Sequence, residues 1–120
     1  SYVVGIDIFY NAVENAYRNS FINKLDSNTD FIAGDMLESL RLDIGNLIII
    51  SNPPYLPGSY QDYLDYLYIG GEGGIEYINR LVRYFSGSKA IKLLFIVSSY
   101  SDINRLKNVI YSYNLKMVLI

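Results

Sequence analysis

An apolar run at residues 47–50 (Leu-Ile-Ile-Ile) is followed directly by the segment 51–55, which reads Ser-Asn-Pro-Pro-Tyr. Such a run of bulky apolar residues predicts a strand that is buried on both faces, as in a parallel sheet. Proline has no backbone N–H, and the residue before a proline is held extended. The chain must therefore leave the sheet here as a stiff loop at the carboxyl end of a strand, where open α/β sheets bind their ligands.

Composition excludes several classes of chemistry. The 120 residues carry a net charge of −2, and 51% of them are hydrophobic. The chain is therefore expected to form one domain, residues 1–120, with a core of its own and no general attraction to phosphate backbones or anionic membranes. Because Cys and His are both absent, thiol catalysis, Cys/His zinc sites and histidine acid–base chemistry are excluded, and no metal site is predicted. No segment is long and apolar enough to span a membrane, so we expect a cytoplasmic protein.

Apolar, β-branched stretches alternate with stretches of helical periodicity along the chain. The predicted strands are 2–8, 30–35, 47–51, 91–97 and 115–120, and the predicted helices are 11–18, 75–86 and 101–113, with a short helix or turn at 36–42. Strands that alternate with helices form a parallel, doubly wound sheet with right-handed crossovers. The sequence therefore predicts an α/β fold with a mostly parallel, Rossmann-like sheet.

Three consecutive predicted strands end in polar side chains, namely Asp7, Asp35 and Asn52. The carboxyl ends of parallel strands meet at one edge of a sheet, so we expect these three residues to lie along that edge. An acid that ends the second strand of a nucleotide-binding fold commonly binds the hydroxyls of a ribose. The pattern predicts a nucleotide site next to the Asn-Pro-Pro-Tyr loop.

Several of these segments resemble the class I S-adenosylmethionine-dependent methyltransferases. Residues 3–8 with the helix that follows resemble the second strand and helix of that family, and 34–37 (Gly-Asp-Met-Leu) resembles its adenine-side acid motif. Residues 51–55 resemble the signature of the branch that methylates amino groups, which includes adenine-N6 enzymes and the glutamine methyltransferases of release factors. Residues 70–76 resemble the Gly-Gly-x-x-Gly segment of the release-factor enzymes, the HemK type. The short gap between Tyr55 and Gly70 resembles the archaeal and eukaryotic form of that type.

The resemblance implies a methyltransferase fold that is truncated in this chain, and it implies roles for individual residues. The implied catalytic residues are Asn52, Pro53, Pro54 and Tyr55, and the implied residues for S-adenosylmethionine are Asp7, Ile8, Asp35, Met36 and Asn52. The implied protein partner is a release factor, with an activating subunit or self-association as further expectations.

The chemistry of the loop agrees with that role. An amide nitrogen is a poor nucleophile because its lone pair is delocalised. The Asn52 side-chain oxygen and the Pro53 carbonyl could accept its two N–H groups and direct the lone pair at a methyl donor, while Tyr55 packs against the planar acceptor. Positioning of this kind contributes several kcal/mol, and acceptors that favour positive charge developing on nitrogen add to it. No titrating base is needed.

The family's glycine-rich cofactor loop is expected upstream of Tyr2 and is absent from these 120 residues. The domain is therefore expected to be incomplete at its N-terminus and also at its C-terminus. The gap left by the missing first strand is expected to close by pairing of 2–8 with 47–51, or to be filled by another chain. Without the loop we expect a dissociation constant for S-adenosylmethionine weaker than ~100 µM.

Three functions remain open on the sequence. The first is N-methylation of a planar amide or amine, with the glutamine of a release factor as the best candidate. The second is adenine-N6 methylation of nucleic acid, which the net charge of −2 and the lack of a basic stripe disfavour. The third is a catalytically inactive scaffold, in which the Tyr-rich loop at 55–68 is an interface.

Overall fold

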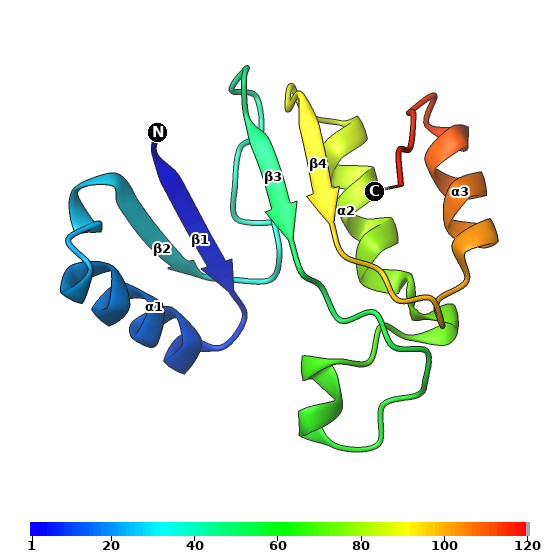
Figure 1. The fold of residues 1–120 in the computed structure, drawn as a ribbon, viewed down its shortest axis with the longest axis horizontal. Helices are drawn as coiled ribbons and strands as arrows, with labels where there is room; N and C mark the ends of the chain where they lie inside the picture. The colour runs from blue at the N-terminus through cyan, green and yellow to red at the C-terminus, as the bar shows by residue number, and fades with distance from the viewer. Residues whose placement is uncertain (120) are drawn as a thin grey trace. The chain divides into compact units, whose positions relative to one another are not determined.

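The computed structural model describes residues 1–119 (Figure 1). Its backbone forms two compact units, Ser1–Arg41 (unit 1) and Leu42–Ile120 (unit 2). Each unit contains one pair of parallel strands, and each is considered separately below.

Unit 1 is a strand–helix–strand unit. Strand β1 (Val3–Asp7) pairs in parallel with β2 (Thr29–Ala33), in a register that runs from Val3 opposite Thr29 to Asp7 opposite Ala33. Helix α1 (Tyr10–Ile22) and the 3₁₀ turn η1 (Asp26–Asn28) connect the two strands, and α1 contacts both of them. A parallel pair needs such a crossover, so the predicted strand, helix and strand are confirmed here.

Helix α1 begins one residue before the predicted range 11–18 and ends four residues after it. The helix begins at Tyr10, and Phe9 is the capping residue without a side-chain bond. The Asp7 carboxylate instead accepts the Phe9 N–H at 2.9 Å and so fixes the turn between β1 and α1.

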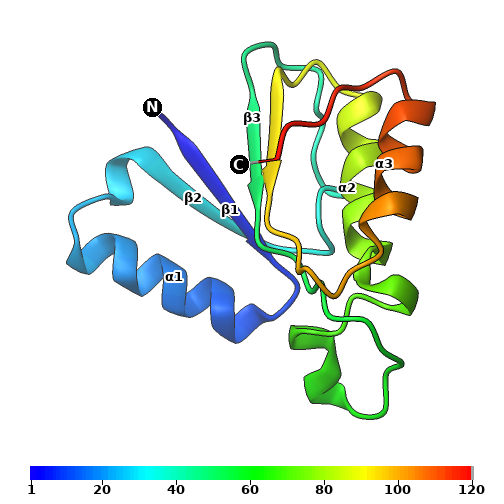
Figure 2. The ribbon, with the colours of Figure 1, turned by 45° about the vertical axis from the view of Figure 1, so that its right-hand side comes forward.

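Unit 2 contains the buried core. Strand β3 (Ile48–Ser51) pairs in parallel with β4 (Lys92–Phe95), with Ile48 opposite Lys92 and Ser51 opposite Phe95. Helices α2 (Glu76–Ser86) and α3 (Ile103–Ser112) lie on the same side of this pair (Figure 2). The core cluster lies between the helices and the strands and consists of Ile75, Ile78, Val82, Leu106 and Ile110.

The apolar stripes predicted for both helices are confirmed, because α2 buries Ile78, Leu81 and Val82 and α3 buries Leu106 and Ile110. Ser101, the first residue of the range predicted for this helix, precedes α3. Asp102 is the N-cap, and its carboxylate accepts the Arg105 N–H at 2.9 Å.

The predicted doubly wound sheet is confirmed only in part. Residues 1–119 form two separate two-stranded parallel sheets, ordered β1–β2 and β3–β4, and the proposed pairing of 2–8 with 47–51 is not among their ladders. Residues 36–39 form a turn, one of the two outcomes predicted for 36–42, whereas 115–119 form no strand. The last residue of the predicted 115–120 strand, Ile120, lies outside the described residues.

Burial of β3 on both faces was also predicted, and this is wrong for the described chain. Ile49, which faces the helices, is 7% exposed, whereas its neighbour Ile50 is 76% exposed. Successive side chains of a strand point to opposite faces, and α2 and α3 cover only one face of the pair.

Candidate functional site

The Asn-Pro-Pro-Tyr segment leaves the sheet directly at the end of β3. Ser51 is the last residue of the strand, and its carbonyl accepts the Ile96 N–H at 3.3 Å. Pro53 is buried, whereas Asn52 is exposed. Within residues 1–119 the Asn52 side chain makes no hydrogen bond. The loop therefore presents one amide side chain, next to a proline that is fixed by burial.

The backbone that follows is held from two sides. The hydroxyl of Ser101, a residue only 6% exposed, donates to the Tyr55 carbonyl at 2.7 Å. On the other side the glycine cluster Gly70–Gly74 approaches so closely that a Cβ on Gly70 would lie 2.6 Å from the Pro54 carbonyl oxygen, and one on Gly74 would lie 2.2 Å from that of Tyr55. Only glycine allows this approach, because any side chain would displace the loop.

The conformation of this cluster gives a second reason for glycine. Gly71, Gly73 and Gly74 have φ angles of +77°, +72° and +66°, in the left-handed region that side chains disfavour. The cluster also contacts the beginning of α3, because the Gly73 carbonyl accepts the N–H of Asp102, the N-cap of that helix, at 2.8 Å. Sequence reasoning identified this cluster but missed that it supports the Asn-Pro-Pro-Tyr loop. The consecutive glycines before a helix were the signal that could have indicated it.

The Tyr55 side chain has a structural contact that the sequence did not predict. It is half-buried and packs against the core cluster of unit 2. The predicted contact between this ring and a planar acceptor remains a prediction. The packing fixes the ring beside the loop.

Four of the five residues predicted to bind the cofactor, all except Asn52, lie in unit 1. Asp7 is exposed at the end of β1, and the exposed Ile8 follows it. Asp35 and Met36 lie half-buried in the turn after β2, where Met36 adopts a φ of +52°. The Gly34 N–H donates to the Asp7 carbonyl at 3.0 Å, so the two strand ends are aligned and the two acids share one edge of this sheet. Asn52 belongs to unit 2, and its predicted place on the same edge remains a prediction.

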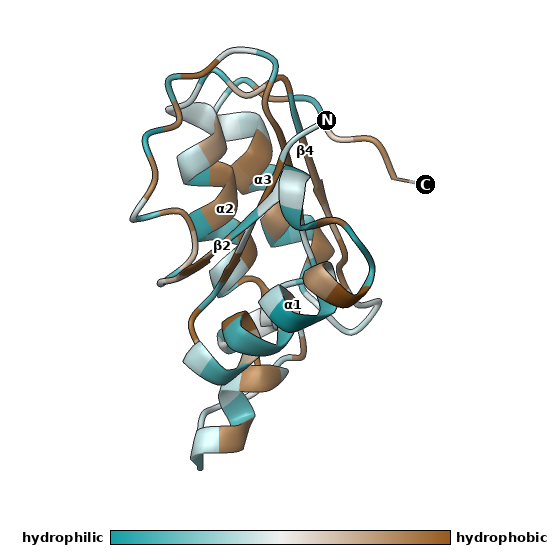
Figure 3. Cartoon of the chain, turned by 90° about the vertical axis from the view of Figure 1, so that its left-hand side faces the viewer, coloured by the Kyte–Doolittle hydropathy of each residue, from teal (hydrophilic) through white to brown (hydrophobic). Residues whose placement is uncertain are grey.

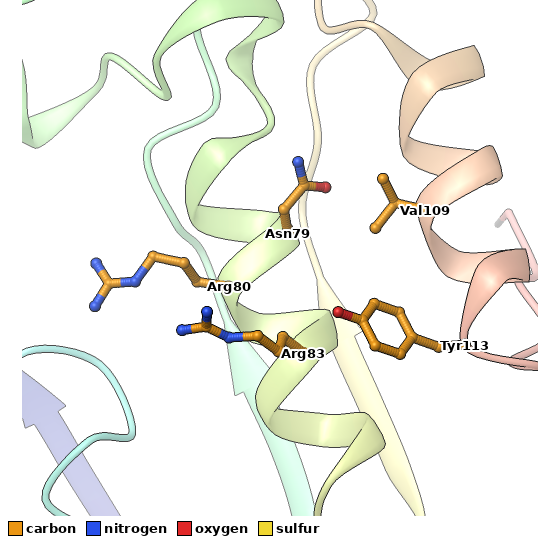
Figure 4. Close-up of a pocket in the computed structure, with 5 residues that line it drawn as sticks. All are labelled: Asn79, Arg80, Arg83, Val109 and Tyr113. Carbon is orange, nitrogen blue, oxygen red and sulfur yellow. The ribbon is translucent and has the colours of Figure 1, made fainter.

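A shallow pocket of about 250 Å³ lies between α2 and α3 (Figure 4). Its lining residues are Asn79, Arg80, Arg83, Val109 and Tyr113. The Asn79 side-chain oxygen is buried there without a hydrogen bond from residues 1–119, while the Arg80 and Arg83 side chains point away from Val109 (Figure 4). None of the predicted site residues lines this pocket.

No helix of residues 1–119 is both long and apolar enough to cross a membrane. The same residues contain no group of three or more Asp and Glu side chains that could hold a metal ion.

No protein-family model matches the chain. It is 30% identical over 117 residues to MJ0928 of Methanocaldococcus jannaschii, a protein whose name assigns it to the protein N5-glutamine methyltransferases; the match covers 88% of this chain and 56% of that protein. It is 39% identical over 56 residues to the release factor glutamine methyltransferase of Fusobacterium nucleatum, which covers 47% of this chain and 16% of that protein. The chain thus spans about half the length of the first relative and a smaller part of the second. Both names support the methyltransferase resemblance seen in the sequence.

Proposed function

We propose that the chain is part of an S-adenosylmethionine-dependent methyltransferase that acts on the side-chain amide of a protein glutamine, with a release factor as its substrate. The observation that carries the proposal is the fixed loop after β3, in which Asn52 is exposed while the backbone from Pro53 to Tyr55 is held in place. The names of the two relatives support the choice of a glutamine over other acceptors.

In this proposal the loop binds the acceptor through oxygen atoms. The Asn52 side-chain oxygen and the Pro53 carbonyl accept the two N–H bonds of the glutamine amide, and S-adenosylmethionine, when bound, supplies an electrophilic methyl group. The two acceptors would direct the amide nitrogen at that methyl group, and one N–H proton of the amide would leave to water. Because Ser101 and the glycine cluster hold the loop before substrate arrives, little reorganisation is required.

The residues of the chain fit the adenosine part of the cofactor. One Asp7 carboxylate oxygen accepts the Phe9 N–H, which leaves the other for a ribose hydroxyl. Ile8, Asp35 and Met36 would lie beside the adenine. The glycine cluster at 70–74 does not offer its backbone to the methionine part, because Gly70 and Gly74 are in close contact with the loop after β3. We therefore expect calorimetry on these 120 residues to give a dissociation constant for S-adenosylmethionine weaker than ~100 µM. A tighter value would contradict the proposal that these residues bind only the adenosine part.

Adenine-N6 methylation is the second candidate function on the Asn-Pro-Pro-Tyr motif alone. Residues 55–76, which follow the motif, carry four carboxylates and no Lys or Arg. Such a segment would repel the phosphate backbone of a nucleic acid. The scaffold hypothesis requires no methyl transfer at all, so the same assay tests it.

The test is methyl incorporation by the whole protein that contains this chain. It would be incubated with radiolabelled S-adenosylmethionine and, in parallel, with a release factor carrying Gly-Gly-Gln and with single- and double-stranded DNA and RNA. We expect label on the release factor at a glutamine. Label on nucleic acid would support the adenine-N6 alternative, and label on no acceptor would support the scaffold.

A further inference from the structure

Directly after the predicted acceptor site the chain forms a closed, projecting loop, residues 56–70 (the tyrosine loop). Its base is closed by the Leu56 N–H, which donates to the Tyr68 carbonyl at 2.9 Å, and by the Gly70 N–H, which donates to the Leu56 carbonyl at 2.8 Å. The loop extends away from the strands and helices of unit 2 in both ribbon views (Figures 1 and 2). Since Leu56 follows Tyr55, the base of the loop adjoins the acceptor site.

The tyrosine loop is ordered by its own contacts. It contains the 3₁₀ turn η2 (Tyr63–Leu67), which Asp62 caps by accepting the Leu64 N–H at 2.7 Å. The rings of Tyr60 and Tyr66 stack with their centroids 4.7 Å apart and their planes 17° apart. A surface that is formed before its partner binds loses less conformational entropy on binding.

The loop exposes apolar side chains that its own contacts do not require. Leu64 is 58% exposed and Leu67 is 56% exposed, and the rings of Tyr66 and Tyr68 are also exposed. Contiguous exposed apolar groups of this kind, rich in tyrosine, are typical of protein interfaces.

The charged side chains of the loop and of the glycine cluster after it are all acidic. The four carboxylates of residues 55–76 are Asp62, Asp65, Glu72 and Glu76, and no Lys or Arg lies among them. Hydrogen bonds from the backbone N–H groups of Gln61 and Asp62 and from the Tyr68 hydroxyl lower the pKa of Asp65 below its ordinary value of 3.8. Asp65 is therefore charged throughout the physiological pH range.

We propose that the tyrosine loop, with Glu72 beside its base, binds a basic segment of the protein substrate that carries apolar residues and flanks the acceptor glutamine. The apolar side chains of the segment contact Leu64 and Leu67, and its Lys or Arg residues face the carboxylates. Opposite charges across such a surface give specificity and suppress wrong partners, and nucleic acid is disfavoured by the same field. This inference rests on the proposed function, because it assigns the loop to the acceptor of that site.

Binding is tested with two fluorescent peptides that share a central Gly-Gly-Gln and flanking leucines, one with Lys and Arg in the flanks and the other with Glu. Fluorescence anisotropy is measured on the whole protein. We expect the basic peptide to bind roughly tenfold more tightly at low salt and its advantage to shrink at 0.5 M salt, because salt screens exposed charges. Equal affinities for the two peptides would overturn the proposal.

Variants locate the binding on the loop. Glu72 is exposed, and its carboxylate makes no hydrogen bond with residues 1–119, so Glu72→Lys should leave the fold intact. The substitution should weaken binding of the basic peptide roughly fivefold, the scale of an exposed charge pair. Asp43→Lys makes the same charge change at an exposed residue elsewhere in unit 2 and should leave this binding unchanged. Leu64→Ser should weaken binding and Leu119→Ser should not. Equal effects of Glu72→Lys and Asp43→Lys would overturn the proposal.

The two proposals fail differently. If the protein methylates a release-factor glutamine but Glu72→Lys leaves the KM for that substrate unchanged, the loop does not recognise the substrate and the methyltransferase proposal stands. If no glutamine is methylated, the methyltransferase proposal fails and this inference fails with it. If single-stranded DNA displaces the basic peptide and crosslinks to the loop, the loop binds nucleic acid and the inference is overturned.

Discussion

Units 1 and 2 are built from the same local elements and differ in what those elements bury. Unit 2 contains all seven buried Ile, Leu and Val side chains of the described chain: Ile49, Ile75, Ile78, Leu81, Val82, Leu106 and Ile110. Pro53, in the same unit, is buried as well. In unit 1 the one buried residue is Ser20. Regular strands and a helix therefore do not by themselves give a core.

The number of packed elements accounts for the difference. Unit 1 has one helix, α1, which is hydrophilic along much of its length (Figure 3), and Val3, Val4, Phe21 and Ile22 remain exposed. Unit 2 has two helices whose apolar stripes meet on one face of its strands. We infer that the predicted acceptor loop lies on the stable unit, whereas Asp7 and Asp35 lie on a unit that depends on further contacts for its stability.

Truncation of a core residue should have the largest effect. Ile78→Ala in unit 2 is expected to lower the free energy of unfolding by about 2–5 kcal/mol, because it leaves a cavity among buried side chains. Val4→Ala, at an exposed residue of β1, should cost less than about 1 kcal/mol. Urea titrations followed by circular dichroism measure both values, and similar losses would contradict the contrast between the units.

Glycine substitutions test whether the loop after β3 is held in place as firmly as the core of unit 2. Gly74→Ala combines a φ of +66° with a Cβ that would lie 2.2 Å from the Tyr55 carbonyl oxygen, so it should cost at least about 2 kcal/mol. In the matched change in unit 1, Gly34→Ala, the nearest atom to the new Cβ would be the Ser39 hydroxyl at 3.0 Å, which can rotate, and the other neighbours would lie at ordinary contact distance. Thermal unfolding compares the two, with Gly45→Ala, whose Cβ would meet nothing, as the neutral control. If Gly74→Ala left the unfolding temperature unchanged, Gly74 would not hold the loop after β3 in place.

The smallest expected effect is a local response of the tyrosine loop to pH. Because its hydrogen bonds place the folded pKa of Asp65 below the ordinary 3.8, the stabilisation is complete above that value and is lost as the pH falls through the lower, folded pKa. Hydrogen exchange at the Gln61 amide, which donates to Asp65 at 2.6 Å, should therefore lose protection only in acid. Loss of that protection near neutral pH, or an unchanged rate in Asp65→Asn at pH 6, would contradict this assignment.

The sequence was sufficient for local structure and insufficient for long-range packing. Periodicity predicted the buried stripes of α2 and α3, and the two prolines predicted where β3 ends. The open face at Ile50 could not be predicted, since an apolar run does not reveal what covers it. The support of the site was equally hidden, because Ser101 and Gly74 meet the Tyr55 carbonyl only through folding, from positions 46 and 19 residues away along the chain.

The central claim is that Asn52 binds the acceptor amide, and methyl transfer by Asn52→Ala tests it most directly. The whole protein and this variant would be compared by mass spectrometry of a Gly-Gly-Gln release factor after incubation with S-adenosylmethionine. Loss of one positioning acceptor is expected to reduce kcat at least about 100-fold, while the urea midpoint changes little because Asn52 is exposed and makes no hydrogen bond within residues 1–119. Methylation of the glutamine at an undiminished rate by a folded Asn52→Ala variant would contradict the account.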